Sequence, residues 1–152
     1  MNLIKYKTQK ENDLISIVEE DQFIISGGNL TTPQSVEKIM KEIFHIHKET
    51  EEYIYELCLN SKLKPIGIFE VSHGTVNQSL ISPREFYQKA LLAGAAYVIA
   101  IHNHPSGCCT PSSEDHKITK KLKEAGQLIG VTLIDFIIIG DERFSFKEKD
   151  FL

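Results

Sequence analysis

The alternation of apolar and polar residues along the chain predicts a mixture of strands and helices. Runs rich in aliphatic and aromatic residues predict strands over residues 51–60, 65–72, 97–101, 131–139 and 143–147. A short polar turn separates the first two of these runs, so we expect them to form an antiparallel hairpin. Apolar residues at helical spacing predict three helices, one before the first run, one between the second and third, and one between the third and fourth.

Capping signals mark where these helices begin and end. Thr32-Pro33 predicts the first start, with a capping hydroxyl and proline at the first helical position. The segment Ser82-Pro83-Arg84-Glu85 predicts the second start as a capping box, which would engage Glu85 as a cap. Ser112 or Ser113 predicts the third start, and Gly130 predicts the end of that helix.

The first 30 residues are less informative. Residues 3–6 and 14–18 suit short strands, and Gly27-Gly28-Asn29 predicts a turn before the main part of the chain. We therefore expect residues 1–30 to be an N-terminal extension and residues 31–152 to be a single main domain. A content of 41% hydrophobic and 25% charged residues suits one domain with a substantial core.

The strand over residues 97–101 leads directly into His102-Asn103-His104. Successive side chains of a strand point to opposite faces, so the two histidines should point the same way and Asn103 should point away. The following loop is long enough to fold Asp115 back toward them from the first turn of the next helix, where the helix dipole favours a carboxylate. Two histidines and one carboxylate are a ligand set for catalytic zinc, with the fourth position left for water.

Other histidines are less suitable as ligands. His45 and His47 follow a helical stretch in which residues i and i+2 do not face each other, so we interpret them as surface residues. His73 follows a predicted strand, and we interpret it as a loop residue because three protein ligands already suffice. The predicted ligands of Zn²⁺ are therefore His102, His104 and Asp115.

The spacing from His102 and His104 through Ser112 to Asp115 resembles the JAMM motif of the MPN/JAB metallo-isopeptidase superfamily. More narrowly, the chain from about residue 30 to residue 152 resembles the bacterial RadC family. The segments that carry this second resemblance are His-Asn-His-Pro-Ser-Gly, Pro111-Ser112, residues 82–86 and residues 137–140. The resemblance implies an α/β (α+β) fold of the JAB1/MPN type, which is cytidine-deaminase-like, with one mixed β-sheet flanked by helices.

The resemblance also implies roles for two further residues. Glu52 matches the carboxylate that accepts a proton from the zinc-bound water, and Ser112 matches the serine that positions this water or stabilises the oxyanion. Glu56 departs from the family pattern, in which an apolar residue is usual. Strand alternation leaves two alternatives for Glu56, an exposed charge or a second carboxylate near the cleft.

The resemblance implies zinc-dependent hydrolysis of a peptide or isopeptide bond in a peptide or protein substrate. Two alternatives stay open: a zinc-containing interaction module in a DNA-repair or mobile-element setting without hydrolase activity, and a metal-dependent nuclease. The net charge of −4 argues against strong nonspecific binding to DNA. Full-length RadC-like proteins carry a helical module like those that bind DNA, and we expect none within these residues.

Three cysteines do not form a disulfide framework, and no apolar run is long enough to predict a signal peptide or a membrane span. We therefore expect a cytoplasmic protein without a membrane partner. Cys108 and Cys109 lie in the loop between the predicted ligands, where RadC-like chains often have other residues. They are either a tolerated loop variation or a source of a thiolate that reaches the open zinc position.

Overall fold

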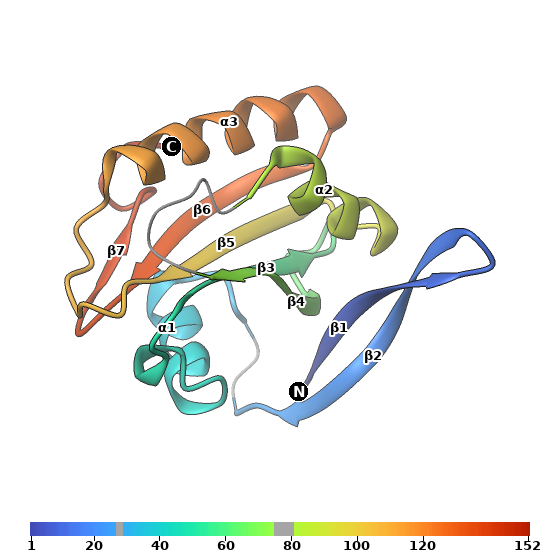
Figure 1. Cartoon of the computed structure of the whole chain (residues 1–152), viewed down its shortest axis with the longest axis horizontal. Coiled ribbons are helices and arrows are strands. Elements are labelled where there is room, and N and C mark those ends of the chain that lie inside the picture. The colour runs from blue at the N-terminus through green and yellow to red at the C-terminus, as the bar shows by residue number, and fades with distance from the viewer. Residues whose placement is uncertain (27–28, 75–80) are drawn as a thin grey trace.

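A computed structural model describes residues 1–26, 29–74 and 81–152 as one seven-stranded sheet with helices on both faces (Figure 1). The mixed α/β architecture predicted from the sequence is therefore confirmed. The strands are β1 (Asn2–Glu11), β2 (Leu14–Ile24), β3 (Glu52–Leu59), β4 (Pro65–Gly74), β5 (Tyr97–Asn103), β6 (Thr132–Ile139) and β7 (Arg143–Ser145). The helices are α1 (Pro33–Glu42), the short 3₁₀ helix η1 (Ile46–Lys48), α2 (Pro83–Leu92) and α3 (Ser113–Ile129).

The strand order across the sheet is β2-β1-β4-β3-β5-β6-β7. β3 pairs antiparallel with both β4 and β5, so the predicted hairpin of β3 and β4 is present. β5 pairs parallel with β6, because α3 connects these strands over one face of the sheet. The strand that carries the two histidines is thus paired on both of its sides.

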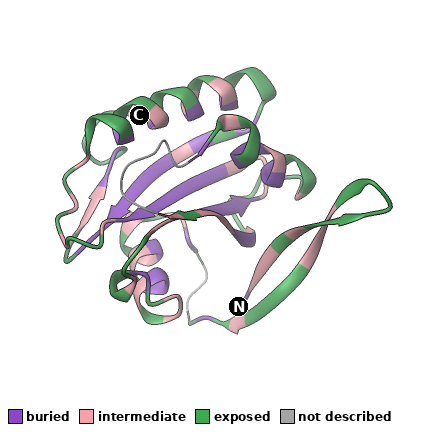
Figure 2. Ribbon diagram, in the orientation of Figure 1, coloured by how far each residue is buried: buried purple, intermediate pink, exposed green. Residues whose placement is uncertain are grey.

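Strand alternation divides the core into two layers on opposite faces of the sheet. One layer packs α2 and α3 against side chains that include Ile54, Ala100 and Phe136. The other packs α1 and η1 against the neighbouring side chains, which include Tyr55 and Ile101. Figure 2 shows these strands buried between the helices, as their continuous apolar sequences require.

The predicted helix starts agree with the structure. Thr32 caps α1, Ser82 caps α2 and Ser112 caps α3, each by accepting a hydrogen bond from the backbone N–H three residues later. Gly130 ends α3 with φ 75°, a left-handed conformation that glycine adopts readily. The capping box predicted at Ser82 is only half present, since Glu85 donates its N–H to Ser82 but its carboxylate makes no reciprocal cap among the described contacts.

The N-terminal strands are longer than the sequence predicted. β1 and β2 pair along their whole length around a turn at Asn12 and Asp13, which both have positive φ. Paired asparagine and aspartate tolerate this conformation and match the twist of a two-residue hairpin. β1 also pairs parallel with β4, so the hairpin extends the sheet, and its tip projects from the body in Figure 1. The turn predicted at Gly27-Gly28 lies outside the described residues.

Two strand ends also differ from the prediction. β4 continues to Gly74, so His73 belongs to a strand and is not a loop residue; it is exposed and lies 2.7 Å from Glu70. β7 ends at Ser145, two residues earlier than predicted, because the chain turns there. His45 and His47 are exposed beside η1, as expected for surface residues. Among the described helices, none is both long and apolar enough to span a membrane.

Glu56 is fully buried in the middle of β3, so the structure supports neither an exposed charge nor a carboxylate open to a cleft. Its side chain is 0% exposed, and neither carboxylate oxygen has a hydrogen-bond partner among the described residues. Burial raises the pKa of Glu56 well above its ordinary value, and the positive charge of Lys89 opposes this only in part. Burial therefore favours the neutral, protonated form of the Glu56 carboxyl.

Because the pKa of Glu56 is higher in the folded chain, its contribution to stability is fully present below its unfolded value of 4.5 and is lost as pH rises. Each pH unit in this window should lower the free energy of unfolding by about 1.4 kcal/mol. Glu56→Gln should remove that slope, so the variant gains stability over the wild type as pH increases. Urea denaturation of the metal-free protein from about pH 5.5 to about pH 7.5 measures the two slopes.

Glu19→Gln is the matched control, because Glu19 is an exposed strand residue and its substitution should leave the slope unchanged. Equal slopes in wild type and Glu56→Gln would show that Glu56 is ionised in the folded protein.

Candidate metal centre

The C-terminal end of β5 brings His102 and His104 to one face of the sheet. Their ring centroids lie 4.9 Å apart with an interplanar angle of 86°, whereas Asn103 points to the opposite face, as strand alternation predicted. His102 is almost fully buried and His104 is partly exposed. The ring of His102 therefore lies in the core, and the ring of His104 lies near the protein surface.

Backbone carbonyl groups orient both rings. His102 Nδ1 donates to the carbonyl of Tyr53 at 2.9 Å, and His104 Nδ1 donates to the carbonyl of Cys108 at 2.8 Å. A carbonyl can only accept, so each Nδ1 carries a hydrogen and each Nε2 presents a lone pair. This is the arrangement in which a histidine binds a metal through Nε2. Because the partners are backbone atoms, no sequence motif could have identified them.

The first turn of α3 places Asp115 against both imidazole rings. Asp115 Oδ1 lies 3.7 Å from His102 Nε2, and Asp115 Oδ2 lies 3.4 Å from His104 Nε2. Ser112 holds this carboxylate, since its N–H and its hydroxyl each donate to Oδ2 at 2.7 Å. In return Ser112 Oγ accepts the N–H of Asp115, which completes a capping box at the start of α3.

The first residue of β3 completes the group. Glu52 Oε2 lies 3.8 Å from His102 Nε2, and ligand atoms of Glu52, His102 and His104 all lie within 4.8 Å of one another. The structure thus brings together every site residue that the sequence predicted. The group that can hold a metal ion consists of Glu52, His102 and His104, although the sequence suggested that Glu52 stays off the metal. Asp115, the predicted third ligand, lies against both rings but does not belong to that group.

The protonation states suit a cation. Burial opposes the charge of Asp115, but His104 and the hydrogen bonds from Ser112 lower its pKa to about 2. Burial raises the pKa of Glu52 and lowers the pKa of His102. Burial also opposes the charge of His104, yet the neighbouring Asp115 raises its pKa overall. A cation between these groups would offset the charges of the two carboxylates.

The donor set suits a metal ion. Ligand atoms at about 2.0–2.1 Å from a tetrahedral ion lie roughly 3.3 Å from one another. Asp115 lies 3.4 Å from His104 Nε2 through Oδ2 and 3.7 Å from His102 Nε2 through Oδ1, and Glu52 Oε2 lies 3.8 Å from His102 Nε2. Imidazole and carboxylate are also ligands that zinc accepts. The ligand atoms of Glu52, His102 and His104 are therefore close enough to one another to hold a metal ion.

The cysteine loop contacts this site through its backbone. Cys108 provides the carbonyl that orients His104, while its sulfur lies 3.4 Å from the hydroxyl of Thr110. Cys109 is partly buried against the core. No thiol belongs to the metal-binding group found among the described residues, so the geometry favours the loop-variation interpretation.

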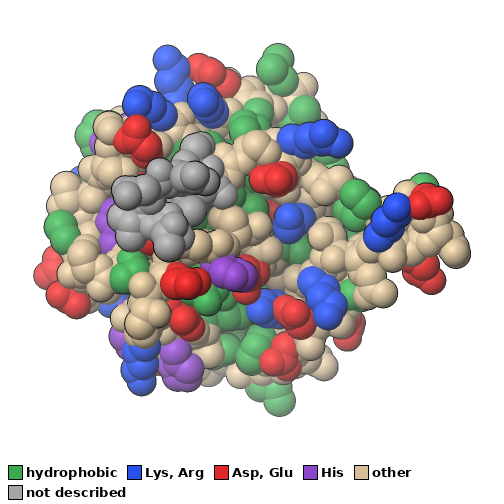
Figure 3. Space-filling view, viewed as in Figure 1, with side chains coloured by type: hydrophobic (Ala, Val, Ile, Leu, Met, Phe, Trp, Pro, Cys, Tyr) green, Lys and Arg blue, Asp and Glu red, His purple; other side chains and the backbone are tan. Residues whose placement is uncertain are grey.

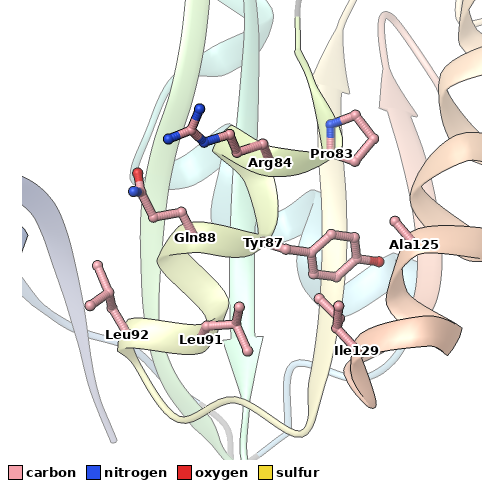
Figure 4. A pocket seen from close by; sticks show the side chains of 8 residues that line it. All are labelled: Pro83, Arg84, Tyr87, Gln88, Leu91, Leu92, Ala125 and Ile129. Atoms are coloured by element: carbon pink, nitrogen blue, oxygen red, sulfur yellow. The ribbon is translucent and has the colours of Figure 1, made fainter.

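A groove of about 520 Å³ opens elsewhere, between α2 and α3 (Figure 4). Its lining is apolar apart from Arg84 and Gln88, and Tyr87 points across it toward α3. None of the residues of the metal centre lines it. The groove is therefore separate from the metal centre.

Comparison with known proteins identifies the family. The sequence model described as RadC-like JAB domain matches residues 30–151. The chain belongs to the RadC-like JAB domain family. The resemblance seen in the sequence is confirmed, and the sheet with its three helices is consistent with the JAB/MPN fold.

Several curated bacterial proteins are similar to this RadC-like chain. A UPF0758 protein of Geobacter sulfurreducens is 37% identical over 133 residues, covering 88% of this chain and 57% of the relative. A UPF0758 protein of Thermotoga maritima is 41% identical over 121 residues, covering 79% of this chain and 53% of the relative. The chain thus spans about half the length of the curated relatives it matches.

Phe136 on β6 lies close to the buried histidine of the metal centre. Phe136 is fully buried and its ring lies 6.4 Å from the ring of His102 and 5.4 Å from that of Phe146. Asp135 accepts hydrogen bonds from Ser145 and from the backbone of Lys147. Phe136 therefore gives His102 an apolar neighbour.

Ser112→Ala should destabilise the metal-free protein, because it removes both the cap of α3 and a hydrogen bond to Asp115. The expected loss is about 1 kcal/mol of unfolding free energy, the usual effect of removing a capping hydroxyl. The pKa of Asp115 should rise, since a bond that stabilises its anionic form is lost. Urea denaturation and carboxyl ¹³C NMR measure the two effects.

Ser113→Ala is the control for this prediction, because Ser113 is exposed at the next position and bonds only to Glu114 among the described residues. Equal destabilisation by the two substitutions would contradict the special role of Ser112.

Proposed function

We propose that this chain is a zinc-dependent hydrolase of the JAMM type that cleaves a peptide or isopeptide bond in a peptide or protein substrate. The observation that carries the proposal is the convergence of two imidazole Nε2 atoms and two carboxylates at one point. Membership of the JAB family supports it, because this family includes metalloproteases. The names of the relatives give no activity.

In this proposal His102, His104 and Asp115 hold the ion. Their donor atoms are two neutral nitrogens and one anionic oxygen, each oriented by a hydrogen bond from or to the protein. Bound Zn²⁺ would supply a Lewis acid and make a water molecule a stronger nucleophile near neutral pH. The remaining work is done by side chains around the ion.

Glu52 is the proposed general base. Its carboxylate lies beside His102 at the edge of β3, and burial raises its pKa toward the range in which proton transfer in both directions is efficient. It would accept a proton from the attacking water and deliver that proton to the leaving amine. If Glu52 has this role, the site should still bind zinc when Glu52 is replaced.

Ser112 is proposed to orient Asp115. The resemblance suggested that Ser112 positions the water or stabilises the oxyanion, but its hydroxyl hydrogen is directed at Asp115 Oδ2. A hydroxyl has only one hydrogen to donate. Ser112 can assist the oxyanion only if Asp115 releases that hydrogen bond, so orientation of the ligand is its principal proposed role.

The alternative functions are separated by experiment. Acidic and basic side chains are interspersed on the face seen in Figure 3, which offers DNA no continuous basic surface there. Zinc-dependent cleavage of DNA by the protein would favour the nuclease. Zinc binding without hydrolysis of any peptide or isopeptide substrate, together with binding of DNA or a repair protein, would favour the interaction module.

The purified protein should hold about one zinc ion per chain, since the site offers one ligand set. His104→Ala and Asp115→Ala should each lose most of this zinc, because a ligand is removed. Elemental analysis after dialysis against a weak chelator measures the content. His47→Ala is the matched control, because His47 is exposed and outside the site, and it should retain full zinc. Zinc at wild-type content in both ligand variants would refute the assignment.

Glu52→Gln should retain zinc and lose hydrolytic activity by roughly 10²–10⁴-fold, the usual contribution of a general base. Glu56→Gln and Glu85→Gln should change the rate only modestly, because Glu56 is buried and Glu85 lies on α2. The measurement combines zinc content with turnover of peptide and isopeptide substrates. An active Glu52→Gln beside an inactive Glu56→Gln would mean that the base has been assigned to the wrong carboxylate.

A further inference from the structure

Asn103 stands between the two histidines but faces the other side of the sheet. It is 1% exposed, a degree of burial that a polar side chain tolerates only when its hydrogen-bonding groups are satisfied. Its side chain reaches toward η1 and the start of β3. It therefore lies behind the metal centre, in the layer that packs against α1.

The carboxamide of Asn103 makes three hydrogen bonds, all to backbone groups. Oδ1 accepts the N–H of Tyr53 at 2.6 Å, and Nδ2 donates to the carbonyl of Glu51 at 3.0 Å and to the carbonyl of Ile46 at 3.2 Å. Both amide hydrogens are used, and the identity of the partners fixes which atom is oxygen. Two of the partners are the residues immediately before and after Glu52.

These bonds replace a missing part of the sheet. The ladder between β3 and β5 ends at the pair Ile54 and His102, so Glu52 and Tyr53 pair with β4 but have no backbone partner on β5. Asn103 is the next residue of β5, and its side chain takes the place of the absent ladder bonds. Without it, the backbone of Glu52 and Tyr53 would be held on the β5 side only by the bond from His102 Nδ1 to the carbonyl of Tyr53.

We propose that Asn103 is a positioning residue that sets where Glu52 stands relative to His102 and His104. Asn103 separates the two histidines in sequence and also binds the backbone on both sides of Glu52. A single buried side chain therefore sets the distance between the proposed base and the histidine ligands. The catalytic role of Asn103 rests on the proposed function, in which Glu52 is the general base. The placement itself can be tested without metal.

A matched control lies at the other end of β3. Asn60 also holds backbone groups, since its Oδ1 accepts the N–H groups of Lys62 and Lys64 in the turn that leads to β4. Asn60→Ala therefore removes an asparagine clamp from the same strand, but at a distance from Glu52. An effect that Asn103→Ala produces and Asn60→Ala does not produce is specific to the end of β3 that carries Glu52.

The experiment is carboxyl ¹³C and imidazole ¹⁵N NMR on the full chain, first without metal and then during addition of Zn²⁺. In the wild type, zinc should shift the signals of Glu52, His102 and His104. Asn103→Ala should move the metal-free Glu52 signal and should lose most of its zinc-induced shift, while the two histidine signals still respond. Asn60→Ala should behave as the wild type in all of these signals.

Several outcomes would overturn the inference. One is a Glu52 signal that Asn103→Ala leaves unchanged both without and with zinc; another is an equal change in Asn60→Ala. A loss of the histidine responses together with that of Glu52 would assign Asn103 a general structural role. If zinc shifts no histidine signal in the wild type, the proposed function fails, and the metal-free Glu52 signal alone decides the positioning role.

A second variant guards against misfolding. Asn103→Asp keeps an oxygen that can accept the N–H of Tyr53 but loses both donors, so the displacement of the Glu52 signal should be smaller than in Asn103→Ala. Circular dichroism verifies that each variant is folded. If Asn103→Ala does not fold, Asn103→Asp provides the test. A displacement by Asn103→Asp as large as that by Asn103→Ala would refute the part assigned to the Tyr53 bond.

Discussion

The register of β5 between β3 and β6 is the constraint on which the metal centre depends. His102 pairs with Ile54 on one side and with Ile138 on the other, so the strand cannot slide without breaking two ladders. A slip of one residue would turn both histidines into the layer beneath α1 and would present Asn103 to the site. The apolar residues before His102, which fill both core layers, therefore also fix which way the ligands point.

The remaining members of the site reach this point from different parts of the chain. β3 contributes Glu52 because it lies antiparallel to β5 and begins where β5 ends. α3 contributes Asp115 because its N-terminus starts over the same end of the sheet, with Ser112 fixing the carboxylate. The ends of strands and helices can hold such a site, because their unpaired backbone groups are available to orient side chains.

The buried polar groups of the molecule fall into two kinds. His102, Asn103 and Asp115 each have hydrogen-bond partners, and these partners impose a direction on each side chain. Glu56 is buried as deeply but has no partner among the described residues, so burial raises its pKa and no hydrogen bond imposes a direction on it. The contrast separates the residues that build the site from a residue that only fills the core beside α2.

Local sequence patterns predicted the helix starts and the meeting of His102, His104 and Asp115, whereas the fold type and the roles of Glu52 and Ser112 came from the family resemblance. Alternation in 97–104 predicted that the histidines share a face, and the spacing to Asp115 carried the family resemblance. The pattern predicted strands near the N-terminus that are too short. The turn at Asn12 and Asp13 is a weak hairpin signal, because the strands on either side are rich in lysine and glutamate.

Only the tertiary structure decided how near Glu52 comes to the histidines, that Glu56 is buried, and that Asn103 joins β5 to the start of β3. These features depend on which segments become neighbours after folding. The partners of the histidines and of Asn103 are backbone atoms, which every residue possesses, so the sequence carries no mark of them.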